Sequence, residues 1–151
     1  MGHRITTQSR GHGGPTYRAP SHRYKAALKH LGRAGETISY KIIDIEHDPA
    51  RHTPIALVDV PDGENTYVLV TEGMGIGDVL TWGADAEIRN GNTLPLQEIP
   101  TGSSVCNIEA YPNDGGKFVR ASGVQATVTD KMEGRVAVRM PSGSTKWFNG
   151  Q

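Results

Sequence analysis

Seven lysine and arginine side chains fall within the first 33 residues, a segment that contains no aspartate or glutamate. Positive charges spaced along a flexible segment can neutralise phosphates spaced along a groove. The pattern therefore favours a nucleic acid as partner, and RNA in particular. The rest of the chain carries nine basic and sixteen acidic side chains, so the net charge of zero hides one positive end. The basic positions of the segment are Arg4, Arg10, Arg18, Arg23, Lys25, Lys29 and Arg33.

Histidines and tyrosines share this basic segment. The wide spacing of the histidines offers no preformed metal geometry, so contact with phosphates is the favoured interpretation. A tyrosine beside an arginine or lysine can stack on an unpaired base. We include His22 and Tyr24 among the candidate RNA-binding residues. The histidines and tyrosines of the segment are His3, His12, His22, His30, Tyr17 and Tyr24.

A glycine-rich basic turn over residues 113–123 is a second candidate phosphate site. Small residues allow a backbone to approach a phosphate closely, and Lys117 and Arg120 supply positive charge there. An ordinary surface turn explains the same residues equally well. Phe118 and Trp147 can also stack on bases, although packing in a core is at least as good an explanation for both.

Two further motifs are weaker. The glycines at 73, 75 and 77 lack the spacing of a nucleotide-binding loop and precede a predicted strand rather than a helix. His47 and Asp48 resemble a catalytic pair, but no nucleophile accompanies them, which disfavours a hydrolase. We expect a structured turn here that exposes Arg51. We therefore predict no enzyme activity, no metal site and no cofactor.

Composition narrows the class of protein. The 151 residues contain no apolar run long enough to span a bilayer, and the N-terminus lacks the apolar core of a signal peptide. A cytoplasmic location with no membrane partner is the resulting expectation. The one cysteine, Cys106, allows no internal disulfide and is expected to be a small buried side chain. Nineteen glycines and nine prolines favour short strands and tight turns over helices.

The elements that would position the basic residues follow in order. Residues 1–36 read as an extended basic arm that orders on its partner, with a short helical turn capped by Ser21. In residues 37–88 the apolar alternation slips by one residue after Ile42, which predicts a bulged, bent first strand. A hairpin around the Asp62-Gly63 turn and a strand ending at Trp82 follow. Five short strands would make an OB-like barrel.

Residues 89–151 are expected to form a second, SH3-like barrel. The proline-rich stretch after Gly91 serves as a linker or opening loop. Strands are predicted at 104–109, 123–129, 135–140 and 144–148, with a turn at 141–143 between the last two. The predicted fold is thus all-β: an OB-fold barrel, then an SH3-like barrel, with an extended basic N-terminal arm.

Four separated motifs, in order, resemble the universal large-subunit ribosomal protein L2 family in its archaeal and eukaryotic form. They are RAPSHRYK at 18–25, DIEHDPAR at 44–51, GNTLPL at 91–96 and GGKFVRASG at 115–123. The resemblance runs from the first residues to the turn at 141–143. It implies the same two barrels, resting on large-subunit ribosomal RNA beside neighbouring ribosomal proteins in the cytoplasmic ribosome.

The resemblance also implies a role for particular residues. Lys117 and Arg120 match basic positions of an RNA-facing glycine-rich motif, and Arg18, Arg23 and Lys25 match the motif of the arm, with Arg51 as a further match. Members of the family are structural components that support subunit association, tRNA binding and the peptidyl-transferase region by organising RNA.

One departure from the family concerns its C-terminal end. Family members continue into a long basic tail rich in glycine and histidine, whereas this sequence ends at Gln151. We therefore expect a fragment or truncated form whose second barrel has an open edge. The main alternative function is a free-standing OB-type RNA-binding or translation-factor module, which would bind many single-stranded RNAs.

Overall fold

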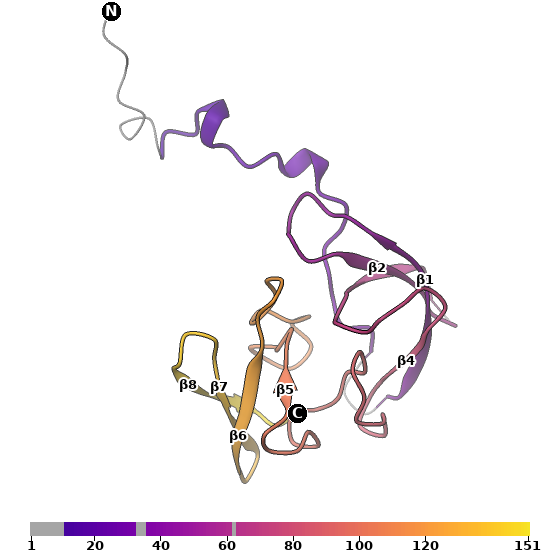
Figure 1. The fold of residues 1–151 in the computed structure, drawn as a ribbon, viewed down its shortest axis with the longest axis vertical. Helices are drawn as coiled ribbons and strands as arrows, with labels where there is room; N and C mark the ends of the chain where they lie inside the picture. The colour runs from indigo at the N-terminus through magenta and orange to yellow at the C-terminus, as the bar shows by residue number, and fades with distance from the viewer. Residues whose placement is uncertain (1–10, 33–35, 62) are drawn as a thin grey trace, which may run out of the picture.

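The computed structural model describes residues 11–32, 36–61 and 63–151, built around two antiparallel four-stranded sheets (Figure 1). The strand orders are β3-β2-β1-β4 and β5-β6-β7-β8. Among the described residues the helical elements are two short 3-10 turns, η2 (Pro15–Tyr17) and η3 (Ser21–Arg23). The all-β class expected from composition is therefore confirmed. No helix in the described ranges is long and apolar enough to cross a membrane.

The first sheet depends on a long strand that bends. Strand β1 pairs with β4 through its first residues and with β2 through its last ones, and its register shifts between Ile42 and Asp44. The bulge predicted from the slip in apolar alternation is thus confirmed. It lets one strand serve two parts of the sheet. The strands are β1 (Ile38–Glu46), β2 (Ile55–Asp59), β3 (Thr66–Leu69) and β4 (Val79–Trp82).

The hairpin of β2 and β3 forms as predicted, with Ile55 opposite Leu69 and Val58 opposite Thr66. Residue 62 of its turn lies outside the described residues. Five short strands were expected here, and four pair in the described part of this sheet. The buried core consists of Tyr40, Ile42, Ala56, Val58, Val68 and Leu80.

The second sheet differs from prediction at its first two strands. Asn107 has a φ of 51°, which ends the extended backbone, and Gly123 has a φ of 71°, which delays the next strand. The strands are β5 (Ser104–Val105), β6 (Ala126–Met132), β7 (Arg135–Arg139) and β8 (Thr145–Asn149). The predicted turn between β7 and β8 is confirmed by Gly143, whose N–H donates to the carbonyl of Met140 at 2.9 Å.

A separate core fills the second sheet. Its buried members are Leu96, Ile108, Ala126, Val128, Val136, Val138 and Phe148. Each sheet thus has its own apolar cluster, as expected for two modules. The domain limits at 36/37 and 88/89 stay predictions.

Candidate nucleic-acid interface

The outer part of the arm, from residue 11 to η3, extends away from both sheets (Figure 1). Arg18, His22 and Arg23 are exposed along it. Arg4, Arg10 and Arg33 lie outside the described residues. The prediction that Ser21 caps a helical turn is wrong, because Ser21 is the first residue of η3 and Pro20 precedes it without a side-chain cap.

No helix follows η3 in the described residues, because residues 25 and 26 make hydrogen bonds to the first barrel instead. The N–H of Lys25 donates to Oδ1 of Asp48 at 3.2 Å, and Nη2 of Arg51 donates to the carbonyl of Ala26 at 3.1 Å. Nε of Arg51 lies 2.9 Å from Oδ2 of Asp48, and the N–H of Ala50 donates to Oδ1 of the same carboxylate. We call Asp48 and Arg51, with the backbone of residues 25–26 that they hold, the arm clasp.

Asp48 is fully buried within the arm clasp. Burial raises the pKa of its carboxyl, but the N–H groups of Ala50 and Lys25 and the Arg51 guanidinium outweigh burial and hold the pKa below its ordinary value. The carboxylate therefore stays charged and joins two segments of backbone. The expectation of a turn that exposes Arg51 is wrong, because the side chain of Arg51 is only 21% exposed and points to the arm.

Lys25 and Leu28 strengthen the attachment of the arm. The ammonium of Lys25 forms an ion pair with Glu46, whose carboxylate also accepts a bond from the Tyr67 hydroxyl at 3.2 Å. Leu28 is buried with Ile55 and Leu69. Residues 25–28 are therefore part of the first barrel's packing, whereas the residues before them project outward.

The arm also reaches the second barrel. Nε2 of His30 lies 3.1 Å from the carbonyl oxygen of Asn107. A Cβ placed on Gly115 would lie 3.2 Å from the Cα of Lys29, and one on Gly116 would lie 2.3 Å from Oδ1 of Asn107. The two glycines have φ values of 85° and 80°. In the structure the chain itself approaches this backbone closely, and the approach of a phosphate stays a prediction.

Carboxylates make the glycine-rich loop rigid. Glu109 accepts bonds from the N–H groups of Asn113 and Gly115, at 2.7 and 2.9 Å. Asp114 accepts from three further backbone N–H groups of the loop. The loop therefore has a fixed shape without any partner.

Arg120 lies where the two barrels meet. Its Nη1 donates to the carbonyl of Gly116 at 3.0 Å, and its own carbonyl accepts from Oγ1 of Thr53 at 3.1 Å. Burial, and then the positive charge of Arg51, lower the pKa of Arg120. Two cations are thus held close enough to repel each other, an arrangement that an anion would relieve. Lys117 is exposed on the same loop.

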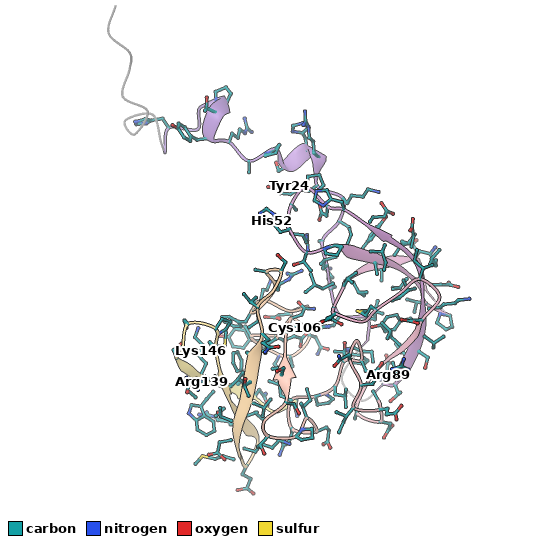
Figure 2. The ribbon with its side chains drawn as sticks, in the orientation of Figure 1. Tyr24, His52, Arg89, Cys106, Arg139 and Lys146 are labelled. Atoms are coloured by element: carbon teal, nitrogen blue, oxygen red, sulfur yellow. The ribbon has the colours of Figure 1, made fainter. Side chains whose placement is uncertain are left out.

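The aromatic candidates separate into two groups. The ring of Phe118 packs edge-on against Phe148, with centroids 5.4 Å apart, and Lys146 lies 4.6 Å from its centroid. Phe118 is therefore a core residue, as one interpretation held. Trp147 is 47% exposed, so core packing is wrong for it: strand alternation turns Phe148 inward and Trp147 outward. Tyr24 is 40% exposed at the base of the arm (Figure 2).

Sequence reasoning missed Glu46, Thr53 and Asn107, whose partners lie far away along the chain. The spacing of Asp48 and Arg51, three residues apart, was the available signal of an ion pair. Cys106 is only partly buried, and burial raises the pKa of its thiol. Within residues 11–32, 36–61 and 63–151, no three histidine, cysteine, aspartate or glutamate side chains are placed to hold a metal ion.

Comparison with known families gives two matches, in the same order as the two sheets. Residues 2–81 match the model described as Ribosomal Proteins L2, RNA binding N-terminal domain. Residues 89–151 match Ribosomal Proteins L2, C-terminal domain. The chain belongs to the ribosomal protein L2 family. The two sheets agree with the OB-fold and SH3-like barrels that the resemblance implied.

Individual members of the L2 family are also similar to the chain. The chain is 99% identical over all its 151 residues to a large ribosomal subunit protein uL2 of Methanospirillum hungatei, of which it covers 64%. It is 70% identical to the uL2 protein of Methanoregula boonei and 54% identical to that of Archaeoglobus fulgidus, covering 63% of each. The chain thus spans somewhat less than two thirds of the length of these curated relatives.

Proposed function

We propose that the chain is a structural component of the large ribosomal subunit that binds large-subunit ribosomal RNA. The observation that best supports this proposal is the arm clasp, which fixes the base of a positively charged arm to a folded barrel. From that base the arm extends away from both sheets (Figure 1), and the side chains of Arg18, His22 and Arg23 are exposed. Relatives that are 99% and 70% identical to the chain are named large ribosomal subunit protein uL2.

The second part of the proposed interface is the junction of the barrels. Arg120 and Arg51 lie near one another there, and Lys117 is exposed on the neighbouring loop. A phosphate at this junction would offset the repulsion between the two guanidinium groups. The arm and the junction would then hold separate stretches of RNA backbone relative to each other.

Family membership motivates our proposal for the finer functions. Support of subunit association, tRNA binding and the peptidyl-transferase region belong to this proposal, as do a cytoplasmic location and contacts with neighbouring ribosomal proteins. The proposed role is to organise RNA, and it assigns no catalytic residue and no cofactor to this chain.

The deciding experiment measures binding to large-subunit ribosomal RNA across a salt series, with and without residues 1–23. The deletion ends there because Lys25 and Leu28 belong to the packing of the barrel. With roughly six phosphates contacted, the log–log salt slope should be about −5. The deletion removes four arginines and should reduce the slope by about 3 to 4 units.

A competitor distinguishes the alternative function. Excess unstructured single-stranded RNA should leave the ribosomal complex intact if the arm and the junction recognise a folded RNA. Complete competition by that RNA would instead favour a free-standing single-strand-binding module. A salt slope near zero would contradict RNA binding in either form.

A further inference from the structure

The outer face of the first sheet carries exposed apolar side chains that RNA binding does not explain. Ile43, Ile76 and Val79 are 43%, 65% and 59% exposed. Backbone hydrogen bonds bring them together: the N–H of Gly77 donates to the carbonyl of Ile42, and the N–H of Ile42 donates to the carbonyl of Asp78, both at 2.9 Å. The three side chains thus come from adjoining stretches of backbone.

The loop that presents Ile76 is held in one shape. Oδ2 of Asp78 accepts from the N–H of Gly75 at 2.8 Å, and the N–H of Asp78 donates back to the carbonyl of Gly75 at 3.2 Å. Gly73 and Gly77 have φ values of 85° and 93°, which other residues rarely adopt. The glycine spacing therefore builds a rigid apolar knob. A partner that binds a rigid surface loses less conformational entropy.

Carboxylates surround this knob. Asp44 follows Ile43 at the bulge and is exposed, and Asp59 pairs across the sheet with Lys41, which in turn pairs with Val79. We call Ile43, Ile76 and Val79, with Asp44, Asp59 and Asp78, the acidic-apolar patch. Its three carboxylates outnumber the one lysine, so the patch repels phosphates and attracts cations.

The strands that carry Ile43 and Val79 lie away from two basic side chains of the second sheet. Strands β1 and β4 lie at the right-hand edge of Figure 1, on the side away from the second sheet. The labelled basic side chains of the second sheet, Arg139 and Lys146, lie at the opposite edge in Figure 2. In this view β1 and β4 thus lie on the other side of the molecule from Arg139 and Lys146.

We propose that the acidic-apolar patch docks a basic segment of another protein. Apolar side chains of that segment would pack on Ile76 and Val79, and its lysines or arginines would pair with Asp44 and Asp59. The proposal goes beyond RNA binding and does not depend on it.

The test titrates the isotope-labelled 151-residue chain with a synthetic peptide of alternating lysine and valine and follows the backbone amides by NMR. Shifts should centre on β1, β4 and residues 73–79. The double variant Ile76→Ser, Val79→Thr should bind about tenfold more weakly, since apolar contact area is lost. Ile88→Ser is the matched control, because Ile88 is 61% exposed elsewhere and should leave affinity unchanged.

Three results would overturn the proposal. A peptide with serine in place of valine could bind equally well, which would reduce the patch to nonspecific charge attraction. A fragment of ribosomal RNA could shift the same amides, which would make the patch an RNA surface. Self-association of the free chain that the double variant abolishes would identify a second copy as the occupant.

Discussion

Nε of Arg51 lies 2.9 Å from Oδ2 of Asp48, and the carboxylate has no exposure to solvent. A buried charge pair is retained only where further hydrogen bonds satisfy both partners. Here the N–H groups of Lys25 and Ala50 donate to Oδ1 of Asp48, and Nη2 of Arg51 donates to the carbonyl of Ala26. Oδ2 of Asp48 and Nε of Arg51 are held by the ion pair alone. One short motif thus ties a basic arm to the barrel that follows it.

Removing the charge of Asp48 should release the arm. The change Asp48→Asn leaves Arg51 partly buried without a counter-charge, which should lower the free energy of unfolding by about 3 kcal/mol. Urea unfolding measures the loss, and tryptic cleavage after Lys25 should become faster. The control Glu46→Gln breaks a more exposed pair and should cost less than about 1 kcal/mol. Equal losses from the two variants would show that the clasp adds no special stability.

The same carboxylate should make stability fall in acid. The pKa of Asp48 is lower in the folded chain than its ordinary value of 3.8. Its stabilising contribution is therefore complete above that ordinary value and is lost as pH falls toward and through the folded pKa. The difference in unfolding free energy between the wild-type chain and Asp48→Asn should be constant above about pH 5 and narrow below about pH 4. A difference that stays constant down to pH 2 would contradict this titration.

Replacing Gly116 should destabilise the chain more than replacing Gly123. Both have positive φ, but a Cβ at Gly116 would lie 2.3 Å from Asn107, whereas one at Gly123 meets nothing within 4 Å. Gly123→Ala should cost about 1 kcal/mol of backbone strain, and Gly116→Ala should cost about 1–3 kcal/mol more. Thermal unfolding of both variants measures the difference. Similar melting temperatures would mean that Asn107 and the glycine-rich loop do not pack as described.

Local patterns predicted the features of the fold that depend on neighbours in sequence. The slip of alternation after Ile42 predicted the bulge in β1, and the Asp-Gly signal predicted the β2–β3 hairpin. Arg51 was interpreted wrongly because the carbonyl that it binds, that of Ala26, lies 25 residues earlier in the chain. Core packing, one of the two interpretations of Trp147, was wrong because which side of β8 faces the core depends on how the strand pairs with β7.

The candidate site was predictable in composition but not in arrangement. Charge alone identified the arm, yet nothing local shows that Lys25 would pair with Glu46. Nor could spacing show that the glycines at 115 and 116 make room for Lys29 and Asn107. Such contacts join segments far apart in sequence, so they arise only when both barrels and the arm have folded together.

Tyr40 should titrate late in an alkaline solution. It is 4% exposed, and burial raises its pKa to about 12 although a bond to Thr93 works in the opposite direction. Because the pKa is raised in the folded chain, the contribution of the buried, neutral Tyr40 to folding stability is present below the ordinary value of 10.0. It is lost as pH rises toward 12. An absorbance titration should show one late tyrosinate phase that Tyr40→Phe removes. Survival of that phase in the variant would assign it to another tyrosine.

Lys117 should contribute to RNA binding through charge alone. It is exposed on a loop whose shape the carboxylates of Glu109 and Asp114 fix, so Lys117→Ala should leave the fold unchanged. If it contacts one phosphate, the variant should reduce the log–log salt slope for large-subunit ribosomal RNA by about 0.9.

Lys41 provides the control for Lys117, because it is equally charged and exposed but lies beside Asp59 on the outer face of the first sheet. Lys41→Ala should leave the salt slope unchanged, since that face is expected to meet protein rather than RNA. Equal reductions from both variants would mean that RNA responds only to the total charge of the chain. A reduction from Lys117→Ala alone would place the phosphate contact on the glycine-rich loop and separate the two faces by partner.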